Sequence, residues 1–319
     1  MEVFRRDPES LEPDRPTVLT IGKFDGIHRG HRHILEAVAA RARAHGWQSA
    51  VIILWPPPPE VLRPGAQIPR LSTLAEREAA LAASGIDQLI LWPFTLELSR
   101  LSPRAFMQLL RRHLDLRVLV IGSDFALGHK RSGTPDVLEA LGQELGFAVV
   151  VSPPYVHEGQ AVSSSRIREH LVAGEVTQAA SLLGRWPTLT GTVVRGAGRG
   201  KNLGFPTANL HLDEPLAVPG HGIYATFATV APEYDAIAQP AVTSIGVRPT
   251  FDDSDEPTIE TFLLDFDDDL YDQTLRLHFV KKLRDELKFD SVEALIAQME
   301  RDVTHAESVL TQHGLAEKN

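Results

Sequence analysis

The chain has 319 residues, of which 43% are hydrophobic and 23% charged, and its formal net charge is -10. A chain of this length usually folds into two domains, and its acidic balance argues against a partner held by the nucleic-acid backbone. Cysteine is absent, which excludes disulfides, cysteine metal ligands and a cysteine nucleophile. No apolar run reaches the length of a membrane span, and the start lacks the apolar core of a secretory signal. We therefore expect a cytoplasmic protein that binds neither nucleic acid nor membrane.

The first half alternates between apolar, β-branched runs and helical patterns. The runs that predict strands are 17–22, 50–55, 88–92, 117–122 and 147–152. Helices are predicted between them, over 31–45 and after the N-cap and proline pairs Ser102-Pro103 and Thr134-Pro135. Residues 55–60, WPPPPE, are expected to form a short rigid loop. This alternation predicts a Rossmann-like parallel sheet with helices on both faces, in which ligands bind at the carboxyl ends of the strands.

The second half, from about Arg185, has shorter alternating strands divided by glycine and proline. They are 191–196, 222–230, 241–247, 259–266 and 275–280, and a helix is predicted over 291–310. Such a pattern is typical of an antiparallel sheet or small barrel. We therefore expect two domains, residues 1–184 and 185–319.

A glycine- and histidine-rich turn follows the first of these strands. Gly22, Gly26 and Gly30 allow close approach of the backbone to a ligand, and the next helix offers free N–H groups that suit a phosphate. His28 and His31 are three apart, so they share one helix face and can donate to phosphate oxygens. The spacing fits neither G-x-G-x-x-G nor the Walker pattern. The alternative is a tight corner with solvent-facing histidines.

A serine- and arginine-rich helix start, VSSSRIREHL, lies at 162–171. Three consecutive serines exceed the need for one N-cap, and Arg166 and Arg168 supply fork-shaped donors for phosphate. Because it follows the last predicted strand, this segment can approach the histidine turn. The alternative is an ordinary capped helix with solvated arginines.

A glycine-rich basic loop, GAGRGKNLGFPTANL, occupies 196–210. It fails the Walker and dinucleotide patterns because Arg195 and Asn202 stand at required glycine and hydroxyl positions. Thr207 and Asn209 lie on one side of an extended chain, and their oxygens suit Mg²⁺ already held by phosphates. The alternative is an ordinary proline–threonine turn.

Glu260 lies on a predicted strand, and alternation groups it with Phe262, Leu264 and Phe266. On such an apolar face the carboxylate would be partly desolvated and suited to act as a base. The alternative places it at the strand end in water. The acidic run 267–269 lacks the EF-hand spacing and is expected to be a solvated turn.

These motifs together resemble the bacterial bifunctional riboflavin kinase/FAD synthetase family. The first half matches in G-x-F-D-G-x-H-x-G-H (22–31), VIGSDFALG (120–128) and VSSSRIR (162–168). The second half matches, in order, in GFPTAN (204–209), GIYA (222–225), SIGVRPTF (244–251), ETFLLDFDDDLY (260–271) and LRDELKF (283–289). The resemblance implies a nucleotidylyltransferase domain followed by a six-stranded antiparallel barrel with a C-terminal helix. It also implies conversion of riboflavin to FMN and of FMN to FAD, with ATP and Mg²⁺.

The resemblance also implies roles for individual residues. Glu260 would be the kinase base, and His28 and His31 would act in adenylyl transfer. ATP in the first domain would be bound by Gly22, Phe24, Asp25, Gly26, Gly30, Ser163, Ser164, Ser165, Arg166 and Arg168, and the flavin by Asp124 and Phe125. ATP in the second domain would be bound by Gly200, Lys201, Gly204, Phe205, Pro206, Thr207 and Asn209. Thr207 and Asn209 would hold Mg²⁺, and Arg284 would lie near the second flavin.

Some positions depart from the family pattern. Lys23 and Arg195 replace a common asparagine and histidine, and a histidine frequent in the family is missing from 55–60. Two alternatives stay open: a kinase whose first domain is a degenerate nucleotide-binding scaffold, and a flavin or nucleotide sensor without turnover. A tRNA synthetase-like function is excluded by the net charge and the lack of an anticodon-type domain.

Overall fold

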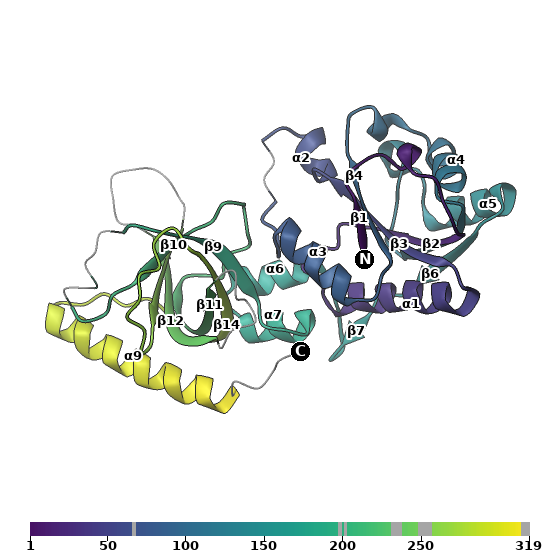
Figure 1. Cartoon of the computed structure of the whole chain (residues 1–319). Helices are drawn as coiled ribbons and strands as arrows, with labels where there is room; N and C mark the ends of the chain where they lie inside the picture. The colour runs from purple at the N-terminus through teal and green to yellow at the C-terminus, as the bar shows by residue number, and fades with distance from the viewer. Residues whose placement is uncertain (66–67, 197–199, 201–202, 231–237, 248–256, 314–319) are drawn as a thin grey trace. The chain divides into compact units, whose positions relative to one another are not determined.

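The computed structural model describes residues 1–65, 68–196, 200, 203–230, 238–247 and 257–313 (Figure 1). They form two compact units. The first consists of Met1–Ile68 and Leu74–Ser163, and the second of Pro69–Thr73 and Ser164–Asn319.

The first unit is built on a six-stranded parallel sheet with the order β1-β4-β3-β2-β5-β6. Its strands are β1 (Glu2–Phe4), β2 (Thr17–Ile21), β3 (Gln48–Trp55), β4 (Gln88–Pro93), β5 (Leu116–Gly122) and β6 (Ala148–Ser152). All five predicted strands are therefore present. The edge strand β1 was not predicted, because only three residues pair with β4 and they form no clear apolar run.

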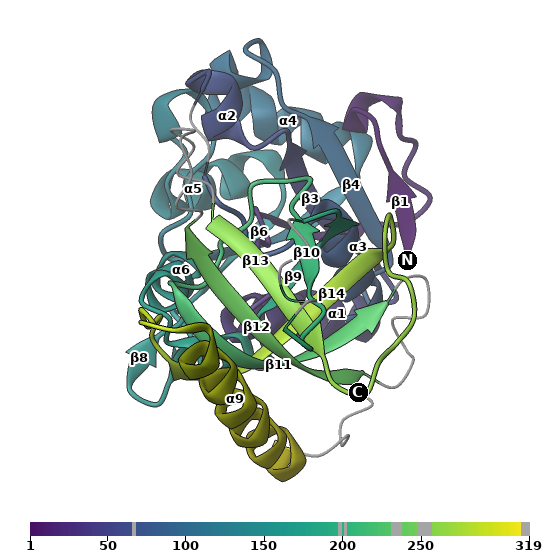
Figure 2. The same cartoon turned by 90° about the vertical axis from the view of Figure 1, so that its left-hand side faces the viewer.

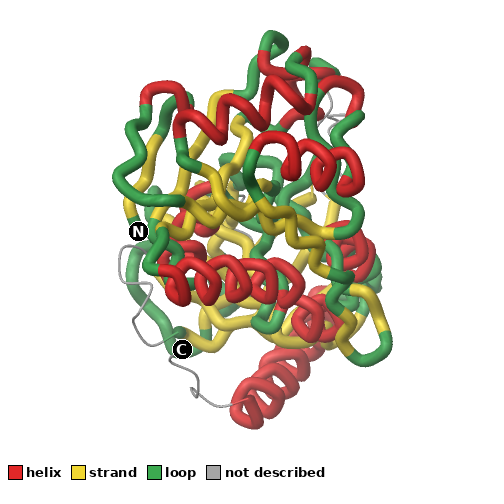
Figure 3. Tube along the Cα trace, turned by 90° about the vertical axis from the view of Figure 1, so that its right-hand side faces the viewer, coloured by secondary structure: helices red, strands yellow, loops and turns green. Residues whose placement is uncertain are grey.

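Helices cover both faces of this sheet, as Figure 3 shows and as the sequence predicted. Side chains of α1 (Arg29–His45) and α3 (Leu74–Ala83) pack on one face, and those of α4 (Pro103–His113) and α5 (Pro135–Leu145) on the other. Successive residues of β2 alternate between the two cores: Val18 joins the first and Leu19 the second. This alternation follows from the two-residue period of a strand and explains the continuous apolar runs.

Several helix ends have the predicted chemistry. Ser102 caps α4 by accepting a hydrogen bond from the Ala105 backbone at 3.2 Å, and Gly46 ends α1 in the left-handed conformation. The prolines of residues 55–60 behave differently from the prediction. A short helix, α2 (Pro58–Leu62), replaces the expected rigid loop because Pro58 occupies a first-turn position.

Shorter elements complete the connections. The 3₁₀ turns are η1 (Pro8–Ser10), η2 (Leu98–Arg100) and η3 (His129–Arg131), and a small hairpin joins β7 (Val156–His157) to β8 (Gln160–Ala161). Helices α6 (Ser164–Val172) and α7 (Val176–Leu183) follow and cluster with the second unit.

The second unit is a closed six-stranded antiparallel barrel with the order β10-β13-β12-β11-β14-β9, shown in Figure 2. Its strands are β9 (Thr188–Val194), β10 (Ala208–His211), β11 (Gly222–Val230), β12 (Gln239–Val247), β13 (Pro257–Leu263) and β14 (Thr274–Arg284). Helix α9 (Val292–His313) packs on β11, β12 and β14. The barrel and the final helix confirm the expected architecture.

The barrel also has polar groups in its interior. Thr243, which is fully buried, lies between Thr226 and Thr261, with hydroxyl oxygens 2.8 and 3.0 Å apart. A hydroxyl can donate and accept at once, so such a chain satisfies buried polar atoms.

The segment 69–73 belongs to the second unit although it lies between α2 and α3 in sequence. The Arg70 backbone N–H donates to Pro215 at 2.8 Å, and Ala217 donates to the Arg70 carbonyl at 2.8 Å. The Arg70 side chain also pairs with Glu214 at 2.8 Å. These contacts add a short parallel bridge to the second unit.

Candidate functional sites

The first candidate site lies at the carboxyl ends of the parallel strands. From β2 the chain continues to β3 on one side of the sheet, whereas β5 continues to β6 on the other. The two neighbouring strands β2 and β5 therefore flank the point where the strand order reverses, which is where open α/β sheets bind ligands. The histidine turn follows β2 and the loop with Asp124 follows β5.

The two histidines of the turn are in direct contact. His28 is the N-cap of α1, and its Nδ1 accepts a hydrogen bond from the His31 backbone at 3.2 Å. The two rings stack with their centroids 3.7 Å apart and their planes at 13°. Gly30 lies between them, and a Cβ there would come within 3.3 Å of the His28 ring and 3.5 Å of the Val162 carbonyl oxygen. The pair is therefore a defined constellation and not two independent surface residues.

His31 is held in its neutral form by its surroundings. Burial, His28 and Arg77, in that order, lower its pKa well below the usual value. Its Nδ1 atom is buried and has no hydrogen-bond partner among the described residues. A buried polar atom without a partner is costly in a folded protein unless a ligand satisfies it. The third histidine, His33, has an exposed side chain whose ring lies 5.5 Å from Tyr155.

The rest of the turn is tightly folded. Gly22 allows the Phe24 ring to fold over it, because a Cβ there would lie 2.9 Å from the ring. Gly26 has a φ of 78°, in the left-handed region that glycine tolerates. Asp25 is buried and directed at Arg77, with 2.9 Å between Oδ1 and Nη2. Arg77 was not predicted as a site residue, because it lies between Glu76 and Glu78 on α3 and so has the pattern of an exposed helix position.

The predicted flavin residues of the first domain lie on the loop after β5. Asp124 is exposed, whereas Phe125 is half-buried and packs on the core. Arg131 Nη2 donates to the Asp124 carbonyl at 3.2 Å, which connects both ends of this loop. The structure thus places Asp124 and Phe125 on the strand end next to the one that carries the histidines.

The serine–arginine segment is divided between the two units. Ser163 belongs to the first unit, while Ser164, Ser165 and Arg166 form the first turn of α6 in the second. The Val162 carbonyl beside Gly30 shows that the chain before the serines does reach the histidine turn. Arg168 donates from Nε to the Pro69 carbonyl at 2.7 Å, so it also tethers α6 to segment 69–73.

The second candidate site lies on the barrel, where β10 meets β13. Asn209 and Glu260 are direct cross-strand partners, so the register places an amide and a carboxylate side by side. Thr207 immediately precedes β10, and a Cβ on Gly200 would lie 3.4 Å from the Thr207 hydroxyl and 2.3 Å from the Phe205 carbonyl. Gly200, Phe205 and Thr207 therefore lie close together, and Asn209 follows Thr207 by two residues on β10.

The remaining residues of this loop include a left-handed glycine and an aromatic contact to β13. Gly204 has a left-handed φ of 85°, and Pro206 is exposed. Phe205 packs edge-on against Phe262 with centroids 5.3 Å apart, which attaches the loop to the strand that carries Glu260. Lys201 lies outside the described residues.

The surroundings of Glu260 differ from one of the two predictions. The strand β13 ends at Leu263, and its buried face consists of Ile259, Thr261 and Leu263. Glu260 lies on the opposite, half-exposed face together with Phe262. The expected apolar face is therefore not formed as a whole, because Leu264 falls beyond the strand.

Arg284 makes structural contacts in the second unit. Its guanidinium binds the nearly buried Asp302 of α9 through two nitrogens, at 2.9 Å from Nε to Oδ1 and 2.6 Å from Nη2 to Oδ2. Gln298 donates to the same carboxylate at 2.9 Å. Arg284 therefore joins the last strand to the final helix.

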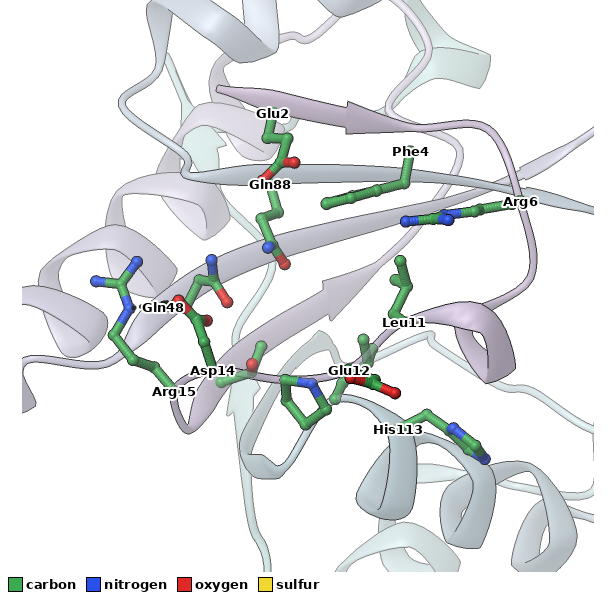
Figure 4. Close-up of a pocket in the computed structure, with 13 residues that line it drawn as sticks. Glu2, Phe4, Arg6, Leu11, Glu12, Asp14, Arg15, Gln48, Gln88 and His113 are labelled. Atoms are coloured by element: carbon green, nitrogen blue, oxygen red, sulfur yellow. Dashed lines mark ion pairs between the residues drawn. The ribbon is translucent and has the colours of Figure 1, made fainter.

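A hollow of about 320 Å³ lies at the opposite, amino-terminal edge of the parallel sheet (Figure 4). Gln48 and Gln88 come from neighbouring strands, and the Arg6 guanidinium lies 5.3 Å from the centre of the Phe4 ring. Its rim holds exposed charges of both signs, including the Arg15 and Asp14 pair at 3.7 Å. None of the predicted site residues lines it.

Over the described ranges, no helix combines the length and the apolar character needed to cross a membrane. In the same part of the chain, no cluster of three or more histidine, aspartate or glutamate side chains forms a ready-made metal site.

Comparison with known proteins defines the class. Residues 10–166 match the family model for FAD synthetase, and residues 183–310 match the family model for riboflavin kinase. The chain is therefore a transferase with two flavin-related domains, in agreement with the two sites described above.

Relatives over the full length define the family. A bifunctional riboflavin kinase/FMN adenylyltransferase of Pseudomonas fluorescens is 37% identical over 306 residues, which cover 95% of this chain and 96% of the relative. The enzyme of the same name from Escherichia coli (strain K12) is 34% identical, covering 92% of each chain. The chain belongs to the bifunctional riboflavin kinase/FMN adenylyltransferase family.

A solved structure shows the same fold. It is described as a macrolide-efflux protein from Streptococcus pneumoniae, is 28% identical, and matches with a TM-score of 0.86 over 96% of this chain and 99% of its own. This likeness supports the architecture, whereas the family assignment rests on the sequence relatives.

Proposed function

We propose that this chain makes FAD from riboflavin in two ATP-dependent steps. The barrel half, residues 185–319, phosphorylates riboflavin to FMN, and residues 1–184 transfer AMP from ATP to FMN with release of pyrophosphate. The observation that carries the proposal is that one chain holds both constellations, the stacked His28–His31 pair and the facing Asn209–Glu260 pair.

In the kinase step, Glu260 takes the proton of the ribityl 5′-hydroxyl as that oxygen attacks the γ-phosphorus of ATP. The bond from the γ-phosphorus to the bridging oxygen breaks, and ADP leaves. A carboxylate within hydrogen-bonding distance of the hydroxyl can accept this proton as a general base. Positioning and charge stabilisation supply most of the rate enhancement in such a transfer.

Mg²⁺ fits the donor set beside Glu260. The Thr207 hydroxyl and the Asn209 amide oxygen are hard, neutral ligands, which suit an ion held mainly by phosphate oxygens. Thr207 and Asn209 would hold the ion against the loop containing Gly200 and Gly204, and Arg284 would lie near the flavin. The bound ion would neutralise the charge of the transferred phosphate.

In the adenylyl transfer step, a phosphate oxygen of FMN attacks the α-phosphorus of ATP, and pyrophosphate leaves. His28 and His31 donate hydrogen bonds to the phosphate oxygens as negative charge shifts toward the leaving group. The N-terminus of α1 adds the positive end of its dipole. No covalent intermediate with the protein is needed, because the two substrates react directly.

The remaining assignments in this half follow the family pattern. Ser164, Ser165 and Arg166 bind the triphosphate, and Asp124 and Phe125 contact the flavin. We place the reactions in the cytoplasm, where ATP is made available, and the small-molecule partners are riboflavin, FMN, FAD and ATP.

Product analysis tests the proposal. The purified chain is incubated with riboflavin, ATP and Mg²⁺, and FMN, FAD and pyrophosphate are measured over time. We expect FMN to appear first and FAD to follow with one equivalent of pyrophosphate. FMN without FAD would show a kinase with a degenerate first domain, and flavin binding without consumption of ATP would show a sensor.

A further inference from the structure

A buried arginine of α3, Arg77, contacts the histidine turn. Arg77 of α3 is only 2% exposed, which is rare for arginine unless it is paired. Its Nη2 donates to Asp25 Oδ1 at 2.9 Å and its Nη1 donates to the Lys23 carbonyl at 3.3 Å. The guanidinium also lies 5.7 Å from the centre of the Trp55 ring. One side chain thus contacts the turn at two points.

Those two points lie on either side of Phe24, in a turn that contains strained backbone. Phe24 and Ile27 have φ values of 48° and 37°, in the left-handed region that non-glycine residues rarely adopt. Such conformations cost on the order of 1–3 kcal/mol each and persist only where the surrounding structure fixes them. Arg77 binds residues 23 and 25, on either side of Phe24, and so fixes the part of the turn that is under strain.

The strained residue Phe24 is in contact with one of the histidines. The Phe24 ring lies 5.0 Å from the His31 ring, and the His31 ring stacks on His28. A shift of the turn would therefore move both imidazoles. The positive charge of Arg77 also acts on His31, since it is one of the causes that lower the pKa of that imidazole.

We propose that Arg77 is a positioning residue for adenylyl transfer, which holds the histidine turn through Asp25 and the Lys23 carbonyl. It touches neither substrate nor the reacting phosphate in this role. The inference rests on the proposed function of the first half. Arg77 lies on α3, outside the turn that carries the histidines. Its loss is expected to impair adenylyl transfer and not riboflavin phosphorylation.

Three variants test this role, each assayed for both activities in the same preparation. Arg77→Met removes the charge and the donor fork, and Arg77→Lys keeps the charge but loses the fork. Arg5→Met is the matched control, because it removes an exposed ion pair to Glu78, the next residue of the same helix, at 2.7 Å.

We expect Arg77→Met to lower kcat for FAD formation from FMN at least about tenfold, since small misplacements of catalytic groups have large effects. KM for ATP and the rate of riboflavin phosphorylation should change less than about twofold. Arg77→Lys should recover part of the loss, and Arg5→Met should match the unmodified chain.

The second measurement is the pKa of His31, which a purely structural role of Arg77 would leave unchanged. The pKa of His31, followed by NMR of labelled histidine and assigned with His31→Asn, should rise in Arg77→Met because a nearby cation that lowers it is removed. In Arg77→Lys it should stay close to its original value. If Arg77→Met does not fold, the kcat loss with unchanged KM in Arg77→Lys tests the inference.

The outcomes separate the two claims. If Arg77→Met keeps its FAD-forming kcat and its His31 pKa, the inference is wrong. If both activities fall together, Arg77 has only a general structural role and the inference is also wrong. If the unmodified chain forms no FAD, the proposed function fails, and the His31 pKa in Arg77→Met alone then decides whether Arg77 acts on the turn.

Discussion

The two candidate sites are assembled in opposite ways. The α/β site depends on one stretch of ten residues, Gly22 to His31, in which strand end, turn and helix start follow one another. The barrel site depends on strand register, which brings Asn209 opposite Glu260 although the two are far apart in sequence. The residues of a local site keep their spacing along the chain, whereas a site built by strand register moves with any slip of a strand.

The electrostatics of the sites differ as well. Next to the α/β site lies a buried ion pair, Arg77–Asp25. Burial, His28 and Arg77, in that order, lower the pKa of His31. Glu260 lies half-exposed on the outer face of its strand. The electrostatic environment of the first site is therefore set by buried protein side chains. That of the second site is set largely by the substrates and ions that bind there.

The largest effect is expected for Glu260→Gln. The substitution keeps the shape of the side chain but removes the base, so FMN formation should fall about 10³-fold. Conversion of added FMN to FAD should continue at its original rate. Both are measured by separating flavins after timed incubation.

Asp268→Asn provides the control, because Asp268 is exposed in the acidic turn after the same strand. It should leave both activities intact. Loss of both activities in a folded Glu260→Gln chain would contradict the assignment of one reaction to each half.

The converse variant, His28→Asn, should affect adenylyl transfer alone. Asparagine still caps α1, so the helix start is kept while the stacked imidazole is lost. We expect FAD formation from FMN to fall about 10²-fold with riboflavin phosphorylation unchanged. His33→Asn, on the exposed side of the same helix, should behave like the original chain, and an equal loss there would mean that the stacked pair has no special role.

The smallest effect concerns the pH dependence of barrel stability. Burial, Arg276 and Arg185 lower the pKa of His278 from 6.5 to about 4. Between these values the unfolded chain binds a proton that the folded barrel excludes, so stability falls as the pH drops from about 6.5 to about 4. The loss should reach about 3 kcal/mol.

Amide hydrogen exchange of the barrel strands at pH 7 and pH 5 measures this loss separately from the parallel sheet. His278→Gln keeps a polar partner for Thr229, which lies 3.3 Å from the imidazole, and removes the titration. The variant should lose less stability on acidification. An identical loss in both chains would assign the effect to other groups.

Most of the fold could be predicted from the sequence because its elements have strong local signals. Five buried strands and the final helix are apolar runs or helical patterns with clear ends. The missed elements are short: β1 has three residues and β10 has four, and each depends on pairing with a distant strand. The helix α2 was not predicted because successive prolines usually indicate a loop. Here the first turn of the helix accommodates them.

The candidate sites could also be predicted in part: local spacing was informative, whereas burial that results from tertiary packing was not. The spacing of His28 and His31 predicted that they share a face, and the structure stacks their rings. Nothing in the sequence singled out Arg77, since its burial results from the packing of α3 on the turn. The half-exposed position of Glu260 was not predicted, because alternation divides the residues of a strand between two faces but does not say which face the barrel buries.

The segment 69–73 has a consequence for how the chain is made. Arg70 precedes its partner Glu214 by 144 residues, so during synthesis it leaves the ribosome long before that partner exists. The stretches on both sides of the segment can fold into the parallel sheet, while the segment itself must stay unpaired and accessible. Because the paired residues are far apart in sequence, this segment pairs late in folding. A fragment that starts at residue 164 would never complete it.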